Sequence, residues 1–304
     1  MSKILWPGVH FGNAETPLPD PRPDPIDGPD DAELAVTPPD VVALLGFDPL
    51  EWDAPAITKA ADPDRERTRR EAEHAFVAAW LAWWRAKLAA IDAPNTPDAV
   101  PERFRVTADE QTHLAHLLHH HLRAPVYLAA LALLREEAGL PVDAATTLTR
   151  SDQLRLETGS QTHMVQVLTT YWSDLQTAFQ QVLNATQDEP DQAGRAQIIT
   201  AQLQQWARHR AAWKGEQIAV TEATDAASQA AEDFAVQNPA VFLRYRWHAV
   251  MDEDTCDACA TLDGQVIAAT QGPYPPLHPN CRCALHPIAR EAVRQSESVQ
   301  PVLT

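Results

Sequence analysis

Cysteine and glycine are scarce in this chain of 304 residues. Only 10 glycines are present, and runs of β-branched residues are short. Strands favour β-branched residues, and the turns between them often need glycine, so long strands find little support outside the C-terminal part. We therefore expect a mainly α fold. The four cysteines all lie between residues 256 and 283, which sets that segment apart from the rest of the chain.

Positive charge is also scarce. The chain has 24 Lys and Arg residues against 42 Asp and Glu residues, which gives a formal net charge of −18. A protein that wraps nucleic acid neutralises phosphates with an excess of cations. The charge therefore argues against that class of function.

Long apolar runs are missing. No segment reaches the roughly 18 apolar residues that a membrane-spanning helix needs. The first residues lack the apolar core of a signal peptide. We therefore expect no membrane partner, and translation into a reducing cytoplasm, where clustered cysteines more often bind metal or react as thiols than form disulfides.

Signatures of common enzyme classes are absent too. The chain has no G-x-x-x-x-G-K-[ST] phosphate loop, no G-x-S-x-G nucleophile elbow, no G-x-G-x-x-G motif and no H-E-x-x-H motif. We therefore identify no catalytic or cofactor-binding residue and expect a protein that is not an enzyme.

Three regions follow from composition and periodicity. Residues 1–64 hold about half of the 25 prolines and much of the acidic excess, which predicts an extended Pro-rich acidic arm. Residues 65–238 have helical periodicity and predict an elongated helical body. Residues 239–304 hold all four cysteines and predict a small α+β module, stapled by Cys and His side chains, with a tail.

One part of the arm is apolar. Residues 41–52 group several large apolar side chains between acidic ones, and residues 41–45 suit a short helix. Two interpretations stay open. The segment packs on the helical body, where Trp80 and Trp84 could receive it, or it docks on a partner and helps to attach the protein there.

Local signals predict the ends of several helices. Thr107 and Glu110 have the spacing of a capping box, and Pro125 is expected to end that helix. Gly139 is expected to cap the next helix at its C-terminus. A preceding helix is expected to carry an apolar stripe and to stop at a proline; the residues are Phe76, Trp80, Trp83, Leu88 and Pro94.

The C-terminal region predicts short strands. Residues 242–252 and 264–270 alternate well enough to form two strands, and we expect strands only between about 240 and 270. Residues 287–295 predict a short helix. A rigid loop rich in proline precedes the last two cysteines.

A run of histidines lies in the helical body. His113, His116 and His120 fall near one helical face, and His119 and His121 complete the run. Metal sites normally add a carboxylate or thiolate from a second element, and none is visible here. We interpret the run as an ordinary polar helix face.

The cysteines have the spacing C-x2-C-x18-H-x2-C-x-C. Two close pairs separated by about twenty residues are typical of a tetrahedral structural zinc site. The candidate ligands are Cys256, Cys259, Cys281, Cys283 and His278, as four thiolates or as three with the histidine. Disulfide pairing is the alternative. A deaminase zinc site needs H-x-E before the first pair, and a redox CxxC leaves two cysteines without a role, so we set both aside.

These residues resemble a known family. The stretches RWHAVMDEDTCDACATLDGQVI and PPLHPNCRCAL resemble the C-terminal module of the phage Mu F-like minor head proteins, also called phage head-morphogenesis proteins. The resemblance covers residues 206–285. The matching positions are Trp247, Asp254, Thr255, Cys256, Cys259, Leu262, Asp263, Gly264, Pro276, His278, Pro279, Asn280, Cys281, Arg282 and Cys283.

The helix before the module carries a further part of the pattern. The family usually has an I-A-R-T-E run there, and this chain has IAVTE at residues 218–222. Thr221 and Glu222 match, whereas Val220 replaces the arginine of the pattern. Val220 has no guanidinium group, so we do not expect it to take the role of that arginine.

The resemblance implies a minor capsid protein of a tailed phage or prophage. Such a protein is associated with the portal and acts in head assembly, and DNA packaging or delivery is a further role that it implies. The implied partners are the portal protein and the major capsid or scaffold protein, and weak or indirect contact with DNA stays open. The implied location is the virion, with the host cytoplasm during assembly. The alternative is an enzyme or toxin-like effector that carries a Mu F-like module.

Overall fold

The computed structural model describes residues 63–142, 147–239, 242–251, 255–268 and 272–289. These residues belong to one compact unit. The acidic arm predicted over residues 1–64, including its apolar segment at 41–52, lies outside the described residues except for its last two. The three domain limits that the sequence predicts therefore stay a prediction.

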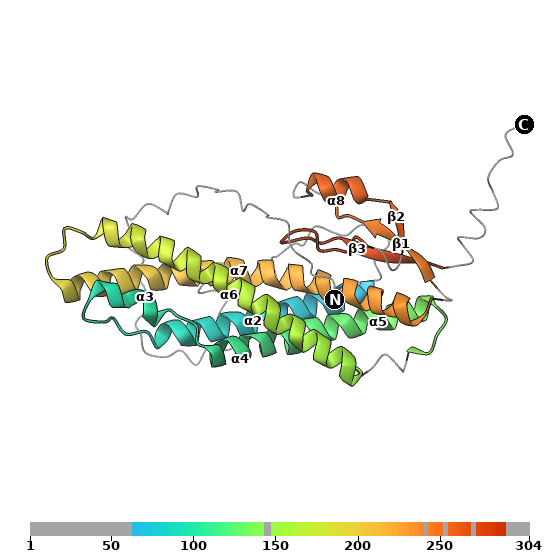
Figure 1. The fold of residues 1–304 in the computed structure, drawn as a ribbon, viewed down its shortest axis with the longest axis horizontal. Coiled ribbons are helices and arrows are strands. Elements are labelled where there is room, and N and C mark those ends of the chain that lie inside the picture. Colours follow the sequence, from blue (N-terminus) through green and yellow to red (C-terminus); the bar gives the residue numbers. More distant parts are fainter. Residues whose placement is uncertain (1–62, 143–146, 240–241, 252–254, 269–271, 290–304) are drawn as a thin grey trace, which may run out of the picture. The chain divides into compact units, whose positions relative to one another are not determined.

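Helices make up most of the described chain, which confirms the mainly α prediction (Figure 1). Between residues 63 and 237 the described elements include no strand. The helical elements are α2 (Pro63–Ala89), η1 (Pro97–Ala99), α3 (Val100–Arg103), α4 (Ala108–Leu118), η2 (His119–Arg123), α5 (Ala124–Glu137), α6 (Arg150–Ala185) and α7 (Gln192–Gln237).

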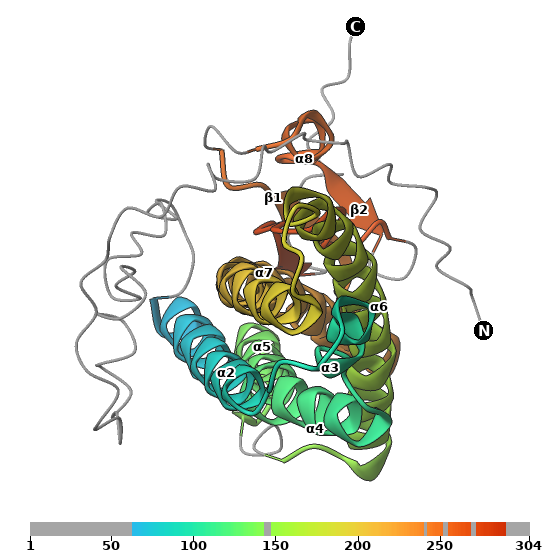
Figure 2. The same ribbon diagram turned by 90° about the vertical axis from the view of Figure 1, so that its left-hand side faces the viewer.

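Helix α7 lies among α2, α5 and α6, as the view along the helices shows (Figure 2). Small residues on α7 allow the close approach of α2. A Cβ added at Gly215 would lie 2.7 Å from the ring of Trp80, and the indole N–H of Trp80 donates to the carbonyl of Ala211 at 2.8 Å. Glycine and alanine at these positions therefore make room for a buried tryptophan.

The predicted apolar stripe of α2 is mostly buried. Phe76, Trp80 and Leu88 are at most 2 % exposed, whereas Trp83 is half-buried. Trp84 is also buried, and its ring centroid lies 4.6 Å from that of Tyr171 on α6. Helices α6 and α7 therefore already contact Trp80 and Trp84, the two residues that the sequence offered as a receiving surface.

The predicted helix caps are present. Thr107 and Glu110 form a reciprocal capping box at the start of α4. Gly139 follows α5 with a φ of 67°, and the N–H groups of Gly139 and Leu140 bond back to the last turn of the helix. This pairing is a Schellman motif, in which a left-handed residue satisfies two terminal carbonyls.

The prediction that Pro125 ends a helix is wrong. The helix continues through a π-helical turn, η2, directly into α5. Pro125 is the second residue of α5. A proline is tolerated in the first turn of a helical segment because its missing N–H is not needed there.

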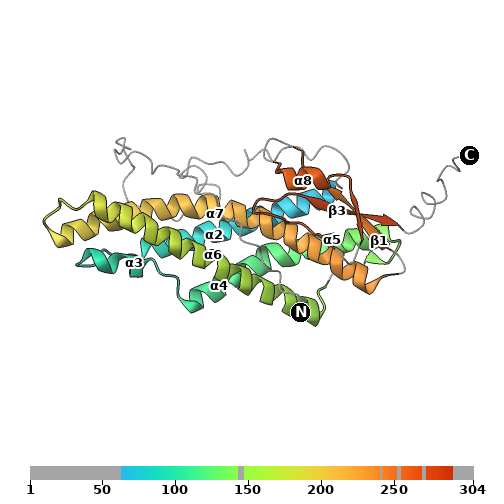
Figure 3. The same cartoon turned by 45° about the horizontal axis from the view of Figure 1, so that its top comes forward.

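The described residues of the C-terminal part form a small antiparallel sheet and one short helix (Figure 3). The elements are β1 (Phe242–His248), α8 (Asp257–Leu262), β2 (Val266–Ala268) and β3 (Ala284–Ala289), and the strand order is β2-β1-β3. This arrangement confirms the small α+β module. It corrects the prediction that strands stop near residue 270 and that residue 287 starts a helix. β3 pairs with β1 along its length, and this edge position tolerates Pro287.

The inner face of the sheet packs on the helices. Tyr245 and Trp247 alternate with exposed arginines along β1 and are fully buried. They share a hydrophobic cluster with Phe234 of α7 and Leu134 of α5. The hydroxyl of Tyr245 donates to the carbonyl of Ala231 at 2.7 Å. Apolar packing and this buried hydrogen bond help to join the module to α7.

A bilayer-spanning helix would need both length and apolar character. Among the helices that the structure describes, none combines the two.

Candidate metal centre

The first cysteine pair is positioned by α8. Cys256 is the N-cap of this helix, and its sulfur accepts from the backbone N–H of Cys259 at 3.4 Å. Cys259 lies within the first turn and is 1 % exposed. The short C-x-x-C spacing therefore turns both sulfurs toward the same side of the helix start.

The second pair follows a tight turn at the start of β3. The N–H of Cys281 bonds to the carbonyl of His278 at 3.2 Å, and Asn280 has a φ of 63°. Asparagine tolerates this left-handed conformation better than most residues. Cys281 and Cys283 are both buried.

The structure brings all five candidate ligands together. Cys256, Cys259 and His278 form one group whose ligand atoms lie within 4.8 Å of one another, and Cys259, Cys281 and Cys283 form a second. Cys259 belongs to both groups. Its sulfur lies 3.2 Å from His278 Nε2 and 3.9 Å from the sulfur of Cys281.

The tautomer of His278 suits a metal ligand. Its Nδ1 lies 2.8 Å from the carbonyl oxygen of Pro279, which can only accept, so Nδ1 carries the proton and donates. Nε2 lies 3.2 Å from the sulfur of Cys259, and in the neutral ring it would keep the lone pair that a metal needs. A backbone carbonyl that fixes the other ring nitrogen is the usual arrangement of a metal-binding histidine.

The distances fit a tetrahedral zinc ion. Zinc–sulfur bonds of about 2.3 Å at tetrahedral angles place two sulfurs about 3.8 Å apart. The separation of 3.9 Å between Cys259 and Cys281 matches that value. All four cysteines are free thiols in the structure, so no disulfide competes for these sulfurs.

The electrostatics of the thiols also suit a cation. Cys283 donates to the sulfur of Cys281 and so lowers the pKa of Cys281 to about 5, and the same bond raises the pKa of Cys283. Burial raises the pKa of Cys259 to about 12. A divalent ion would offset the repulsion among several thiolates.

Other residues of the family pattern build the frame. The carboxylate of Asp263 accepts from the N–H of Ala249 at 2.9 Å, and the N–H of Gly264 donates to the carbonyl of Trp247 at 2.9 Å. Gly264 has a φ of 75°, a conformation that favours glycine. The L-D-G motif therefore joins the end of β1 to the segment that enters β2.

Two hydroxyls of α7 contact the turn between His278 and Cys281. The N–H of Asn280 donates to Thr221 Oγ1 at 3.0 Å, and Thr224 Oγ1 donates to the carbonyl of Cys281 at 2.7 Å. Sequence analysis identified Thr221 through the family pattern and missed Thr224. The available signal was its spacing of three residues, which places both side chains on one helical face.

A second group of metal-binding residue types involves the same segment of α7. His163 of α6 and Glu222 and Asp225 of α7 bring their ligand atoms within 4.8 Å. The guanidinium of Arg123 already ion-pairs with Glu222 and, at 2.7 Å, with Asp225. We therefore identify a closed ion-pair network here. Sequence analysis did not predict this network, because its members are far apart in the chain.

Burial and pairing act against each other in this network. Burial alone would raise the pKa of Glu222, but the nearby Arg123 and His163 lower this pKa by more, so the net shift is downward. Burial lowers the pKa of His163, whereas the hydrogen bond to Glu222 raises it, and the net shift is upward. The network therefore favours a charged histidine beside a charged carboxylate.

The histidine run lies at the π-helical turn. His116 and His120 are exposed and stacked, with ring centroids 5.7 Å apart, whereas His119 is 7 % exposed and faces inward. The ligand groups found in the described part of the chain do not include any of these residues. The interpretation as a polar face holds for the exposed members and is wrong for His119, because η2 turns that residue toward the interior.

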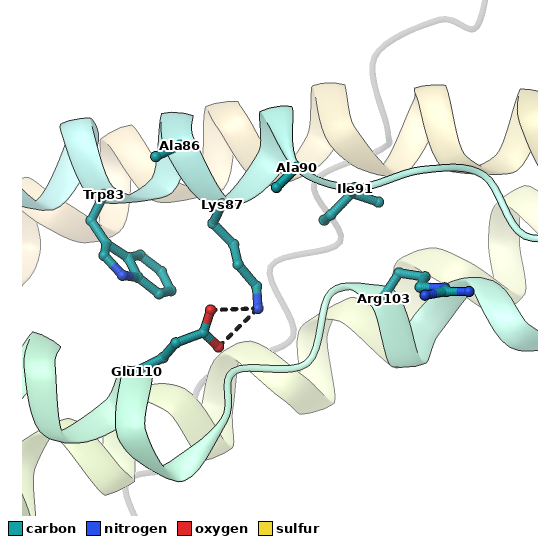
Figure 4. Close-up of a pocket in the computed structure, with 7 residues that line it drawn as sticks. All are labelled: Trp83, Ala86, Lys87, Ala90, Ile91, Arg103 and Glu110. Atoms are coloured by element: carbon teal, nitrogen blue, oxygen red, sulfur yellow. Dashed lines mark hydrogen bonds and ion pairs between the residues drawn. The ribbon is translucent and has the colours of Figure 1, made fainter.

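A shallow pocket of about 350 Å³ lies elsewhere, between α2 and the segment that leads into α4 (Figure 4). Lys87 crosses it and donates to both carboxylate oxygens of Glu110 at 2.8 Å. Burial would raise the pKa of Glu110, but the bonds from Lys87 and from the N–H of Thr107 lower it overall. These contacts serve the capping of α4 and its attachment to α2, and we assign the pocket no ligand.

A comparison with known families matches a segment longer than the small α+β module. Residues 175–286 match the family described as Phage Mu protein F like protein. The matched segment begins within α6, contains all of α7 and ends in β3, so it includes the threonine face and both cysteine pairs. The resemblance is confirmed, and the chain carries a Mu F-like C-terminal module. Searches of curated proteins and of solved structures found no match.

Proposed function

We propose that this protein is a minor structural protein of a tailed phage or prophage head that acts in head assembly. The observation that carries the proposal is the Mu F-like match over residues 175–286. On this proposal the protein is located in the virion and contacts the portal protein, with the major capsid or scaffold protein as a further partner. A role in DNA packaging or delivery rests on the same match. The proposal assigns no enzymatic reaction.

The form of the described chain supports a structural role. A long helix, α7, belongs both to the packed helical body and to the support of the small module. Buried aromatic residues and a buried ion-pair network hold this helix in place. Such a rigid connection suits a protein that links other components.

We further infer that the module holds a structural zinc ion, with ligands drawn from Cys256, Cys259, His278, Cys281 and Cys283. The support is the convergence of these ligand atoms, the free thiols and the orientation of His278. When bound, zinc would supply ordering energy to a short segment rich in loops. Cys259 is the member that both ligand groups share.

Mass spectrometry of purified heads tests the main proposal. Heads assembled with and without the portal protein would be compared for the presence of this chain. We expect the chain in heads that contain the portal and its loss from heads that lack it. Absence from both would contradict the head-protein proposal. Equal amounts in both would contradict the association with the portal.

Elemental analysis tests the zinc ion separately. Protein purified under reducing conditions should contain one zinc per chain. A protein without metal under these conditions would contradict the metal site and leave the proposal for the head untouched. The effector alternative makes a different prediction about the genome, since an effector gene is expected beside an immunity gene and a head gene beside a portal gene.

A further inference from the structure

Two threonines of α7 hold the turn that carries His278 and Cys281. Thr224 donates to the carbonyl of Cys281 at 2.7 Å, and Thr221 accepts from the N–H of Asn280 at 3.0 Å. The two bonds hold adjacent residues of the turn, one through a backbone donor and the other through a backbone acceptor. The turn is therefore fixed on both sides of the peptide bond between Asn280 and Cys281.

The hydrogen-bond directions are well defined. Thr221 Oγ1 donates to the carbonyl of Gln217 at 2.7 Å, so its lone pair is available to Asn280. Thr224 behaves differently from other threonines in helices, which usually bond the carbonyl four residues earlier. Thr200 of the same helix follows the usual pattern and donates to Ala196 at 2.8 Å. Thr224 instead uses its only proton for the module.

The location of these bonds makes them relevant to the metal ligands. Thr224 is 2 % exposed, so water does not compete for its hydroxyl. The turn that it holds includes the left-handed residue Asn280, whose conformation is uncommon outside glycine. That conformation lies between the two ligands His278 and Cys281. A bond that fixes the turn therefore fixes the direction of both side chains.

We propose that Thr224 and Thr221 are positioning residues of the metal centre. They hold the turn so that His278 Nε2 and the sulfur of Cys281 both meet Cys259. Ligands that are already oriented lose less conformational freedom on binding, and the loss of outer hydrogen bonds typically weakens metal affinity by about 10- to 100-fold. This inference rests on the proposed metal site and adds to it the part of α7 that sets its affinity.

Linkage gives the proposal a second consequence. If the threonines orient the ligands, then bound metal must in turn stabilise the contact between the module and α7 by the same free energy. Metal would thus fasten the module to the long helix. A threonine that only contributed to packing would lower the stability of the protein with and without metal equally.

The test measures zinc affinity in the full chain by competition with a chromophoric chelator under reducing conditions. Thr224→Val keeps the shape of the side chain and removes the hydroxyl, and Thr224→Ser keeps the hydroxyl. We expect Thr224→Val to bind zinc about 10- to 100-fold more weakly than the wild type and Thr224→Ser to bind nearly as well. Thr221→Val should weaken binding as well. Circular dichroism confirms that each variant is folded.

Two matched controls separate positioning from general packing. Thr200→Val removes a buried hydroxyl from the same helix, about 36 Å away along its axis. Tyr245→Phe removes a different buried hydrogen bond between the module and α7 without touching the turn. Both should keep the zinc affinity of the wild type. A loss in Tyr245→Phe as large as that in Thr224→Val would overturn the proposal, because docking alone would then explain the effect.

Cobalt substitution gives an independent readout. The absorption of a cobalt–thiolate site depends on the geometry of its ligands, and we expect Thr224→Val to change the spectrum while Thr200→Val leaves it unchanged. Unchanged affinity and an unchanged spectrum in Thr224→Val would overturn the proposal and leave the metal site standing. If the wild type binds neither zinc nor cobalt, the proposed metal site fails, and this inference fails with it.

Discussion

Arg123, on the π-helical turn, forms a buried ion pair with Glu222 of α7, 99 positions later in the chain. Arg123 is 2 % exposed and Glu222 is 7 % exposed. The carboxylate also lies 2.7 Å from Nδ1 of His163 on α6. A single carboxylate thus joins three helical elements, directly beside the residues of α7 that contact the module.

Removal of the arginine should destabilise the protein strongly. Arg123→Met leaves the charge of Glu222 buried without its main partner, and such a loss typically costs about 3–5 kcal/mol of unfolding free energy. Urea denaturation followed by circular dichroism measures the change. The double variant with Glu222→Gln should recover part of the loss, because the unpaired buried charge is then absent.

A matched control uses an exposed pair. Arg67 lies 3.8 Å from Glu71, and both side chains are more than 60 % exposed. Arg67→Met should change stability by less than about 1 kcal/mol, since solvent screens exposed pairs. If Arg123→Met and Arg67→Met gave similar small losses, the ion pair in the interior would contribute little to stability.

His163 should make stability depend on pH. Its folded-state pKa is raised above the ordinary value of 6.5, since the hydrogen bond that His163 donates to Glu222 outweighs the opposing effect of burial. Its contribution is therefore complete below the unfolded pKa of about 6.5 and is lost as pH rises through the folded pKa. The unfolding free energy of the wild type minus that of His163→Gln should decrease over this range.

Three charged side chains surround His163. Arg123 faces it from η2, and Glu222 and Asp225 face it from α7. Glu222 stays ionised over the neutral range because its own pKa is lowered, so His163 is the group in this network whose titration falls there. A difference that stays constant from pH 5.5 to pH 8.5 would contradict the assignment.

Periodicity and capping predicted the helical body well. Long amphipathic segments and the pair Thr107 and Glu110 depend on neighbours in sequence, so a single chain carries the information. Pro125 misled the prediction because the π-helical turn η2 leads directly into α5, and a proline is tolerated in the first turn of that helix. The strand β3 was missed because its support comes from pairing with β1, about forty residues earlier, and no local pattern records that pairing.

The convergence of the candidate ligands was predictable for a similar reason. The spacing of the two close cysteine pairs and His278 is enough to predict candidate metal ligands. The residues that surround the site were not predictable in this way. Thr224 has only its spacing of three residues from Thr221 as a signal. Arg123 contacts Glu222 only because η2 and α7 pack together, and a contact of that kind leaves no signal in one sequence.

Gly215 provides a test of the packing between α2 and α7. Gly215→Ala would gain up to about 1 kcal/mol of helix propensity. The new Cβ would lie 2.7 Å from the ring of Trp80, which is 2 % exposed and hydrogen-bonded to Ala211. Overpacking of this kind typically costs about 1–3 kcal/mol, so we expect net destabilisation in thermal and urea unfolding.

A double variant checks the cause. Trp80→Phe shortens the ring system and should make Gly215→Ala less harmful than it is in the wild-type background. The difference between the two backgrounds measures the coupling between the residues. A net gain of stability in Gly215→Ala alone would show that α2 moves away easily and that the close contact is not a constraint.

Metal removal should affect the module more than the helical body. Zinc present at about 1,000 times its dissociation constant stabilises the folded state by about 4 kcal/mol. Chelation should therefore lower the melting temperature of the wild type. Cys259→Ser should abolish the response to the chelator, because Cys259 belongs to both ligand groups. His209→Ala, an exposed histidine of α7 outside the module, should respond as the wild type does.

Hydrogen exchange locates the effect within the chain. Without zinc we expect faster exchange in the module, beginning with the amides of Cys259 and Cys281, whose backbone bonds lie next to the ligands. The amides of α2 and α6 should stay protected, since their packing depends on aromatic residues of the helical body. Equal loss of protection throughout the chain would contradict a local role of the metal. An unchanged melting temperature after complete removal of zinc would show that apolar packing around Tyr245 and Trp247 suffices to hold the module on α7.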